Sequence, residues 1–221
     1  MKSHAFSRFA VGVAAIVLGL STLALAGPPM ICHAINIGSA QTLPWVDLNY
    51  RKGSGNYDLI NLSQDTLSIL DSSPSVLVHM ETLRRATIYA RQDSQIAKQL
   101  LFRLHARAES ASADGKGALA WFDVGYLAET YKQWLGAGEP NPAKNLDGYA
   151  WVEKAIGLRG SDPEMEFAAA LITLSGPARN RSEHVRKAFD GANTDALLAQ
   201  NLKSTFRNQT VSALLTNGEK E

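Results

Sequence analysis

The sequence has 221 residues and a single cysteine, Cys32. One thiol cannot form an intramolecular disulfide, so packing must stabilise the fold unless Cys32 pairs with another chain or a small thiol. A redox role would need a partner thiol, which this chain lacks. The cysteine content therefore excludes a disulfide-stabilised scaffold.

The chain also lacks an excess of charge of either sign. It has 22 Lys and Arg against 21 Asp and Glu, and loss of Lys2 and Arg8 with the N-terminal leader leaves 20 against 21. Nucleic-acid binders and polybasic membrane-surface proteins need clustered positive charge. We therefore expect neither a nucleic acid nor, once the leader is removed, a membrane as partner.

Two further patterns are missing. No stretch alternates apolar and polar residues with β-branched enrichment, so a sheet is not expected. The glycine-containing pieces at 53–55 and 115–117 lack the spacing and the preceding strand of a phosphate-binding loop. The sequence thus predicts no cofactor.

A signal peptide is the clearest feature present. Lys2 and Arg8 precede an apolar run over 9–20, and Ala24 and Ala26 fit a signal-peptidase site. We expect cleavage after residue 26 and a periplasmic or secreted protein.

The alternative is a retained membrane anchor. No Asp, Glu, Lys or Arg occurs between Phe9 and Val46, and about 20 apolar residues suffice to span a bilayer. Cleavage is favoured because the most apolar stretch is short and Pro28 and Pro29 stop a helix just beyond it.

The remaining chain divides into an arm and a helical domain. Residues 27–56 lack helical periodicity and predict an extended arm, pinned to the body by Trp45 and Leu48. Residues 57–221 show apolar residues at helical spacing between Gly and Pro breakers. Ser73 with Pro74 and Asp93 or Ser94 are expected helix starts. We expect about eight helices, at 57–70, 74–90, 94 to about 114, 118–135, 146–158, 163–174, 181–189 and 195–206.

This order predicts an all-α fold of stacked antiparallel hairpins, because helices joined by short loops pack as antiparallel neighbours. A weak repeat of 33 residues supports stacking: residues 152–156 align with 185–189 and Asp162 with Asp195, giving four identities. Residues 146–202 resemble tetratricopeptide repeats on this basis. The resemblance implies a surface that binds a peptide or protein, and no chemistry.

Aromatic residues are the densest feature of the helical domain. Large aromatics dominate both cores and interfaces, so the set could line a groove, although core packing is the alternative. Arginines on two adjacent helices could converge on an anion, or form a solvated face. The candidate partner- or ligand-binding residues are Trp121, Tyr126, Tyr131, Trp134, Trp151, Arg84 and Arg103.

The sequence thus favours a protein-binding or scaffolding module without catalytic activity, and leaves two alternatives. In a small-molecule-binding protein or enzyme with an interhelical pocket, Glu164 or Glu166 could meet His184 across a hairpin for acid–base work. Carboxylates in a first helical turn, however, also favour the helix dipole. A metal-handling role would use Cys32 and His33, which suit Cu(I) or Zn(II), but zinc needs at least three protein ligands. No catalytic residue is expected.

Overall fold

The computed structural model describes residues 29–45, 54–111, 115–135, 140–175 and 180–206. Throughout these parts the chain forms helices, turns and loops without any β-strand, which confirms the predicted all-α class. Within the same ranges, no helix has the length and apolar character needed to cross a bilayer. The predicted leader, residues 1–26, lies outside the described residues.

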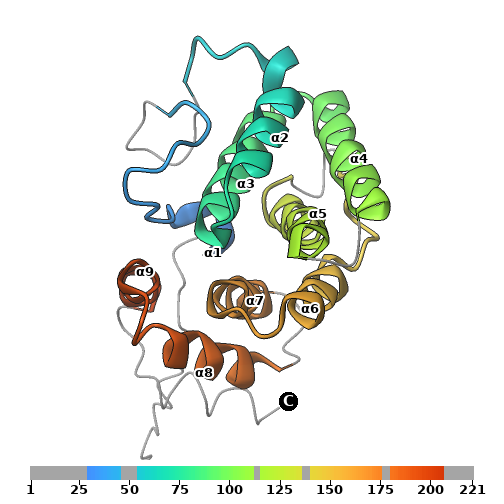
Figure 1. The fold of residues 1–221 in the computed structure, drawn as a ribbon. Helices are drawn as coiled ribbons and strands as arrows, with labels where there is room; N and C mark the ends of the chain where they lie inside the picture. Colours follow the sequence, from blue (N-terminus) through green and yellow to red (C-terminus); the bar gives the residue numbers. More distant parts are fainter. Residues whose placement is uncertain (1–28, 46–53, 112–114, 136–139, 176–179, 207–221) are drawn as a thin grey trace, which may run out of the picture.

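A long connection, residues 33–58, joins α1 to η1, and a shorter one, residues 135–147, joins α5 to α6; the other helices follow one another through shorter connections (Figure 1). One is a single 3-10 turn, η1, at Leu59–Asn61. The α-helices are α1 (Pro29–Cys32), α2 (Leu62–Ser72), α3 (Val76–Ala90), α4 (Ser94–Ser110), α5 (Gly115–Trp134), α6 (Gly148–Arg159), α7 (Pro163–Ser175), α8 (Arg181–Gly191) and α9 (Ala196–Thr205).

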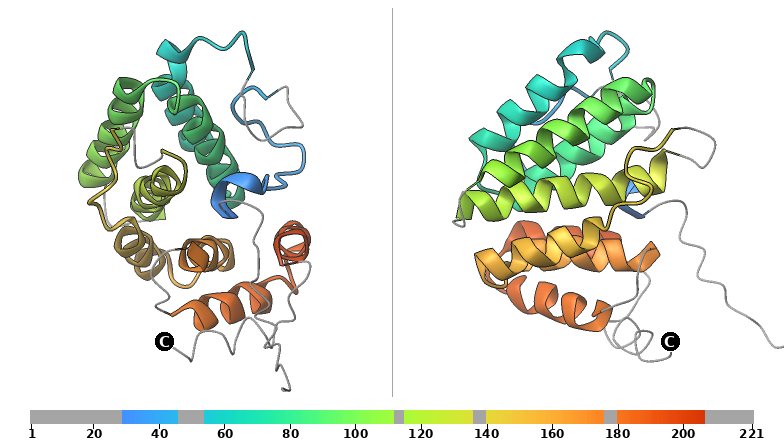
Figure 2. Two further views of the ribbon diagram at one scale, coloured as in Figure 1. Left: turned by 180° about the vertical axis from the view of Figure 1, so that it is seen from behind. Right: turned by 90° about the vertical axis from the view of Figure 1, so that its right-hand side faces the viewer.

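Consecutive helices pack against each other, as expected for stacked hairpins: α2 against α3, α4 against α5, α5 against α6, and α7 against α8. The right view of Figure 2 shows layers running from α2 and α4 at one end to α8 at the other, with α5 between them. Helix α5 also contacts α3 and α7. It is therefore the central helix of the part of the chain that the structure describes.

Helices α5 and α6 cross closely at a point where two glycines face each other. A Cβ atom at Gly125 would lie 2.6 Å from the carbonyl oxygen of Gly148, and one at Gly148 would lie 2.5 Å from that of Gly125. Backbone can approach backbone this closely only without side chains. The pair therefore fixes α6 tightly on the central helix.

Aspartates begin four of the α-helices that the structure describes. Asp93 accepts hydrogen bonds from the amides of Gln95 and Ile96 at the start of α4, as predicted. Asp147, Asp162 and Asp195 do the same for α6, α7 and α9. Each satisfies amides that have no partner inside the helix, and so local sequence sets these boundaries.

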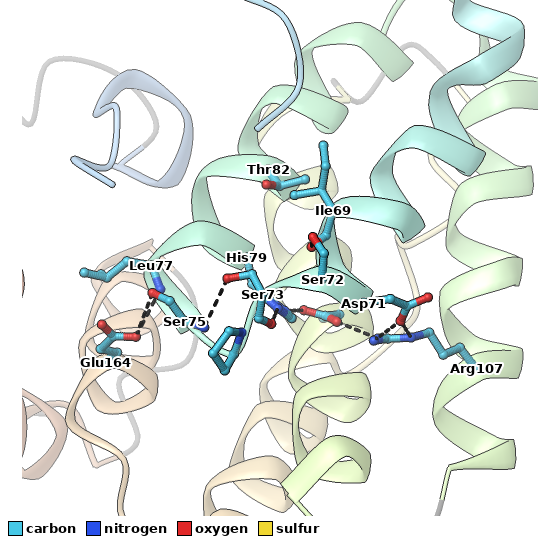
Figure 3. Close-up of polar contacts among 12 residues, drawn as sticks. Ile69, Asp71, Ser72, Ser73, Ser75, Leu77, His79, Thr82, Arg107 and Glu164 are labelled. Atoms are coloured by element: carbon cyan, nitrogen blue, oxygen red, sulfur yellow. Dashed lines mark hydrogen bonds and ion pairs between the residues drawn. The ribbon is translucent and has the colours of Figure 1, made fainter. Parts of the chain in front are cut away.

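Helix α3 does not begin where the sequence predicts. Ser73 was the expected cap, but the helix starts at Val76 and the cap residue Ser75 makes no side-chain cap bond. The acceptor comes instead from α7, where Glu164 Oε2 accepts the amide of Leu77 at 3.2 Å (Figure 3). A partner from another helix has replaced the local cap, and local sequence gives no signal for that.

The arm departs from the prediction in two ways. It opens with the short helix α1 rather than extended chain, and it contributes buried side chains to the core, Met30, Ile31, Ile35 and Leu43. The predicted anchor Trp45 is confirmed: its ring lies edge-on to Tyr89, 6.2 Å between centroids. Leu48, the second expected anchor, lies outside the described residues.

A buried ion cluster on α3 holds this arm. Glu81 binds both Arg84 and Arg85, at 2.7 Å each, and its Oε2 accepts the amide of Ile35 at 2.9 Å. Arg84 donates to the carbonyl of Ile31 and Arg85 to that of Leu43. The cluster therefore supplies partners for an arm that has little regular structure of its own.

Candidate functional site

An open hollow lies between α4, the segment 140–146 and α6, and we call it the α4–α6 groove. Its volume is about 580 Å³. Apolar side chains form much of its surface: Leu101, Phe102, Pro140, Pro142, Leu146 and Trp151. The polar ones are Ser94, Gln95, Lys98, His105 and Asn141.

Helix α4 forms one wall of this groove: one of its faces packs on the body of the protein and another faces the hollow. Ala97, Leu100 and Leu104 form an apolar stripe along α4 that is buried against the body. Phe102 does not belong to that stripe and is 72% exposed. Single exposed apolar side chains are common on protein surfaces, but Phe102 lines an open hollow with other apolar side chains, where its ring is available to a ligand.

Three aromatic rings meet at the α6 side of the groove. His105 lies 5.2 Å from Trp151 and 6.2 Å from Trp121, and the two indoles are 6.2 Å apart, all between ring centroids. The Lys154 ammonium sits 3.4 Å from the centroid of Trp121, within the range of a cation–π contact. Trp121 and Trp151, both predicted, are thus brought together by α5 and α6, and Trp151 reaches the groove.

The other predicted aromatics lie elsewhere. Tyr126 and Tyr131 are fully buried in the core, where a partner has no access to them. Trp134 is partly buried beneath the guanidinium of Arg91, 4.7 Å from its ring centroid. None of these three residues lines the groove.

The arginines on α3 and α4 do not gather around one anion. Arg84 is buried and, like Arg85, binds Glu81. Arg107 pairs with Asp71 and Asp123. Arg103 is exposed on α4, the residue after Phe102. Spacing along α3 indicates the pairs with Glu81, but the partners of Arg107 come from α2 and α5 and cannot be inferred from spacing.

The groove is electrostatically one-sided. Its described lining includes Lys98 and His105 but no Asp or Glu. Glu109, on the next turn of α4, places its Oε2 3.4 Å from His105 Nδ1, but it does not line the hollow. A ligand carboxylate would therefore meet cationic or neutral side chains there.

The hairpin of α7 and α8 brings Glu166 and His184 together, as the enzyme hypothesis required. His184 Nδ1 lies 2.5 Å from Glu166 Oε2, and Nε2 lies 2.7 Å from the Tyr149 hydroxyl. Burial would raise the pKa of Glu166, but the hydrogen bond and charge of His184, with Lys187, lower it. All three members are buried and none lines the groove. Glu164, the other candidate, caps α3 instead.

A second buried pair joins α3 and α5. His79 Nδ1 lies 2.6 Å from Asp123 Oδ1, His79 Nε2 lies 2.9 Å from the carbonyl oxygen of Ser73, and Arg107 binds the other oxygen of Asp123 at 2.7 Å (Figure 3). Sequence reasoning missed this network. The available signal was a single His and a single Asp inside apolar runs, at 78–80 and 122–124.

The predicted metal ligands, Cys32 and His33, lie at the end of α1 and just after it. Among the residues that the structure describes, no group of three or more His, Cys, Asp and Glu side chains is arranged to hold a metal ion. Cys32 and His33 are both partly buried. The two side chains fall short of the ligand number that zinc requires.

Comparisons with protein-family models, with curated proteins and with solved structures found no match to this chain.

Proposed function

We propose that this chain is a protein-binding module whose α4–α6 groove receives a peptide segment of its partner. An apolar side chain of the segment enters the hollow, and an acidic one faces Lys98 and His105. Because the sequence predicts export, we expect the partner in the cell envelope or the medium. The observation that carries the proposal is the exposed ring of Phe102 beside a hollow whose described lining has no carboxylate.

The apolar lining supports an apolar anchor. Trp151 and Phe102 present aromatic surface, and interfaces draw most of their binding energy from a few such residues. Pro140 and Pro142 add rigid apolar surface that loses little entropy when it is covered. A peptide side chain buried here would release water from both partners.

The charge pattern selects among such peptides. With Lys98 and His105 as the ionisable lining residues, an acidic segment is attracted and a basic one repelled, which sets specificity more than affinity. We therefore predict that binding weakens as salt concentration rises.

The test uses short fluorescent peptides containing one apolar anchor flanked by glutamates, compared with copies in which lysines replace the glutamates. Fluorescence anisotropy should show tighter binding of the acidic peptides. Phe102→Ala should raise the Kd about tenfold, the cost of losing a modest interface anchor. Ile60→Ala is the matched control, since Ile60 is 77% exposed and lies on η1 rather than at the groove.

Two results would contradict the proposal. One is equal affinity for acidic and basic peptides, and the other is an equal loss of binding in the Ile60 and Phe102 variants. The groove volume also falls in the range of about 300–1,000 Å³ typical of small-molecule pockets. Tight binding of indole with no peptide binding would favour the small-molecule alternative.

A further inference from the structure

A second hollow, of about 520 Å³, lies where α2 ends and α3 begins, against α4 and the start of α5. We call it the Arg107 hollow. Leu70, Leu119 and Ala120 give it an apolar wall, and Asp71 and Arg107 give it a polar one. It shares no lining residue with the α4–α6 groove, so it is independent of the proposed peptide site.

Arg107 is the functional group of this hollow. Its Nη1 donates to Asp123, while Nε and Nη2 both donate to a single oxygen, Oδ1 of Asp71, at 3.0 and 2.7 Å. Nε and Nη2 form one edge of the guanidinium group. A carboxylate that placed one oxygen opposite each of these two atoms would form the two parallel bonds that guanidinium geometry favours. Asp71 therefore occupies the edge without completing that arrangement.

The two carboxylates hold Arg107 very differently. Asp123 is fully buried and fixed from behind by His79, whereas the Asp71 side chain is 62% exposed. A pair exposed to this extent is weak, because water screens the charges and the side chain gives up freedom to form it. Asp71, whose bonds to Arg107 are drawn in Figure 3, is thus the weaker of the two partners.

The charges of the buried network around Arg107 determine which kind of ligand can replace Asp71. His79 hydrogen-bonds a carbonyl oxygen through Nε2 and a carboxylate through Nδ1. A carbonyl accepts only, and an ionised carboxylate does likewise, so the network contains an imidazolium. Two cations, His79 and Arg107, then face two anions, Asp123 and Asp71. A monoanion exchanged for Asp71 keeps this balance, whereas a phosphate dianion would add a charge.

The geometry points to a binding site for a small organic monocarboxylate. Its carboxylate takes the place of Asp71 on the Nε and Nη2 edge of Arg107, and its hydrocarbon part lies against Leu70, Leu119 and Ala120. Asp71 acts as an internal competitor that closes the site when no ligand is present.

Isothermal titration calorimetry on the full chain tests this, with butyrate and inorganic phosphate as probes. Asp71→Asn removes the competing charge, so butyrate should bind about tenfold more tightly than to the wild type. Arg107→Lys keeps the charge but loses the planar fork and should abolish binding. Arg103→Lys, on the same helix but outside both hollows, should leave it unchanged.

The Asp71 variant keeps the proposal falsifiable even if the Arg107 variant fails to fold. Equal or weaker butyrate binding by Asp71→Asn would overturn it, as would tighter binding of phosphate than of butyrate. Phe102→Ala should leave butyrate binding unchanged, which separates this site from the peptide groove.

Discussion

At the scale of single residues, three glycines in α5 and α6 have opposite roles. Gly125 and Gly148 form the helix crossing, where an added Cβ would meet backbone, while a Cβ at Gly157 would meet nothing within 4 Å. The same substitution therefore tests packing at one site and helix propensity at another.

We predict that Gly125→Ala lowers the free energy of unfolding by about 3 kcal/mol or more, because backbone cannot yield as a flexible side chain can. Gly157→Ala should raise it by about 0.5–1 kcal/mol, since alanine is the better helix former. Urea denaturation followed by circular dichroism measures both. A Gly125 variant as stable as the wild type would mean that the two helices do not cross this closely.

At the scale of the element, α3 carries the buried imidazolium. Burial would lower the pKa of His79, but the charge of Asp123, its hydrogen bond and the Ser73 carbonyl raise it above its ordinary value of 6.5, against the opposing charge of Arg107. A raised folded pKa means that the folded protein retains a proton which the unfolded chain releases.

The resulting stability is fully present below about pH 6.5 and is lost as the pH rises through the folded pKa of His79. We predict that urea midpoints measured from pH 6 upward fall for the wild type and fall less for His79→Gln. Asp123→Asn should flatten the profile as well, because it removes the charge that raises this pKa. An unchanged slope in both variants would assign the pH dependence to other groups.

The helix boundaries show which features of the fold can be predicted from the sequence. Asp93 and Asp195 cap their helices by accepting hydrogen bonds from the backbone amides two and three residues later in the chain. Because these bonds are local, the sequence alone can predict them. Helix α4 was expected to run to about residue 114 but ends at Ser110, where Ala111 adopts an extended backbone. The start of α3 was missed because its acceptor, Glu164, comes from 87 residues away.

The candidate site was predictable only in part, for the same reason. Trp121 and Trp151 were selected by residue type, yet Tyr126 and Tyr131, selected equally, are core residues. Phe102 and His105 are not among the residues that the sequence selected, since their place in the groove depends on α6 and the segment 140–146 lying beside α4. Residue type identified aromatic anchors, and only tertiary structure separated those in the core from those at the groove.

At the scale of the whole molecule, Glu81 joins the arm to the helical body. Burial would raise its pKa, but hydrogen bonds and charge from Arg84 and Arg85 lower it. Its contribution to stability is therefore present above about pH 4.5 and is lost as the pH falls through the lowered folded pKa.

We predict that Glu81→Gln lowers the free energy of unfolding by about 3–5 kcal/mol, because it leaves two guanidinium groups without their buried counter-charge. Hydrogen exchange should show the Ile35 amide, which donates to Glu81, losing protection before amides of α5. Glu183→Gln is the matched control, since Glu183 also forms an i,i+4 pair but is exposed. Equal effects of the two changes would contradict a special role for Glu81.

The two ends of the described chain meet at Asn36 and Asn201. The Asn201 side chain accepts the amide of Asn36 at 2.7 Å and donates to its carbonyl at 2.8 Å, across 165 positions. A contact between such distant positions forms only when a long loop closes, and the entropy cost of that closure slows folding. A chain synthesised from its N-terminus can dock the arm on α3 early, but it cannot close this last contact until α9 has emerged.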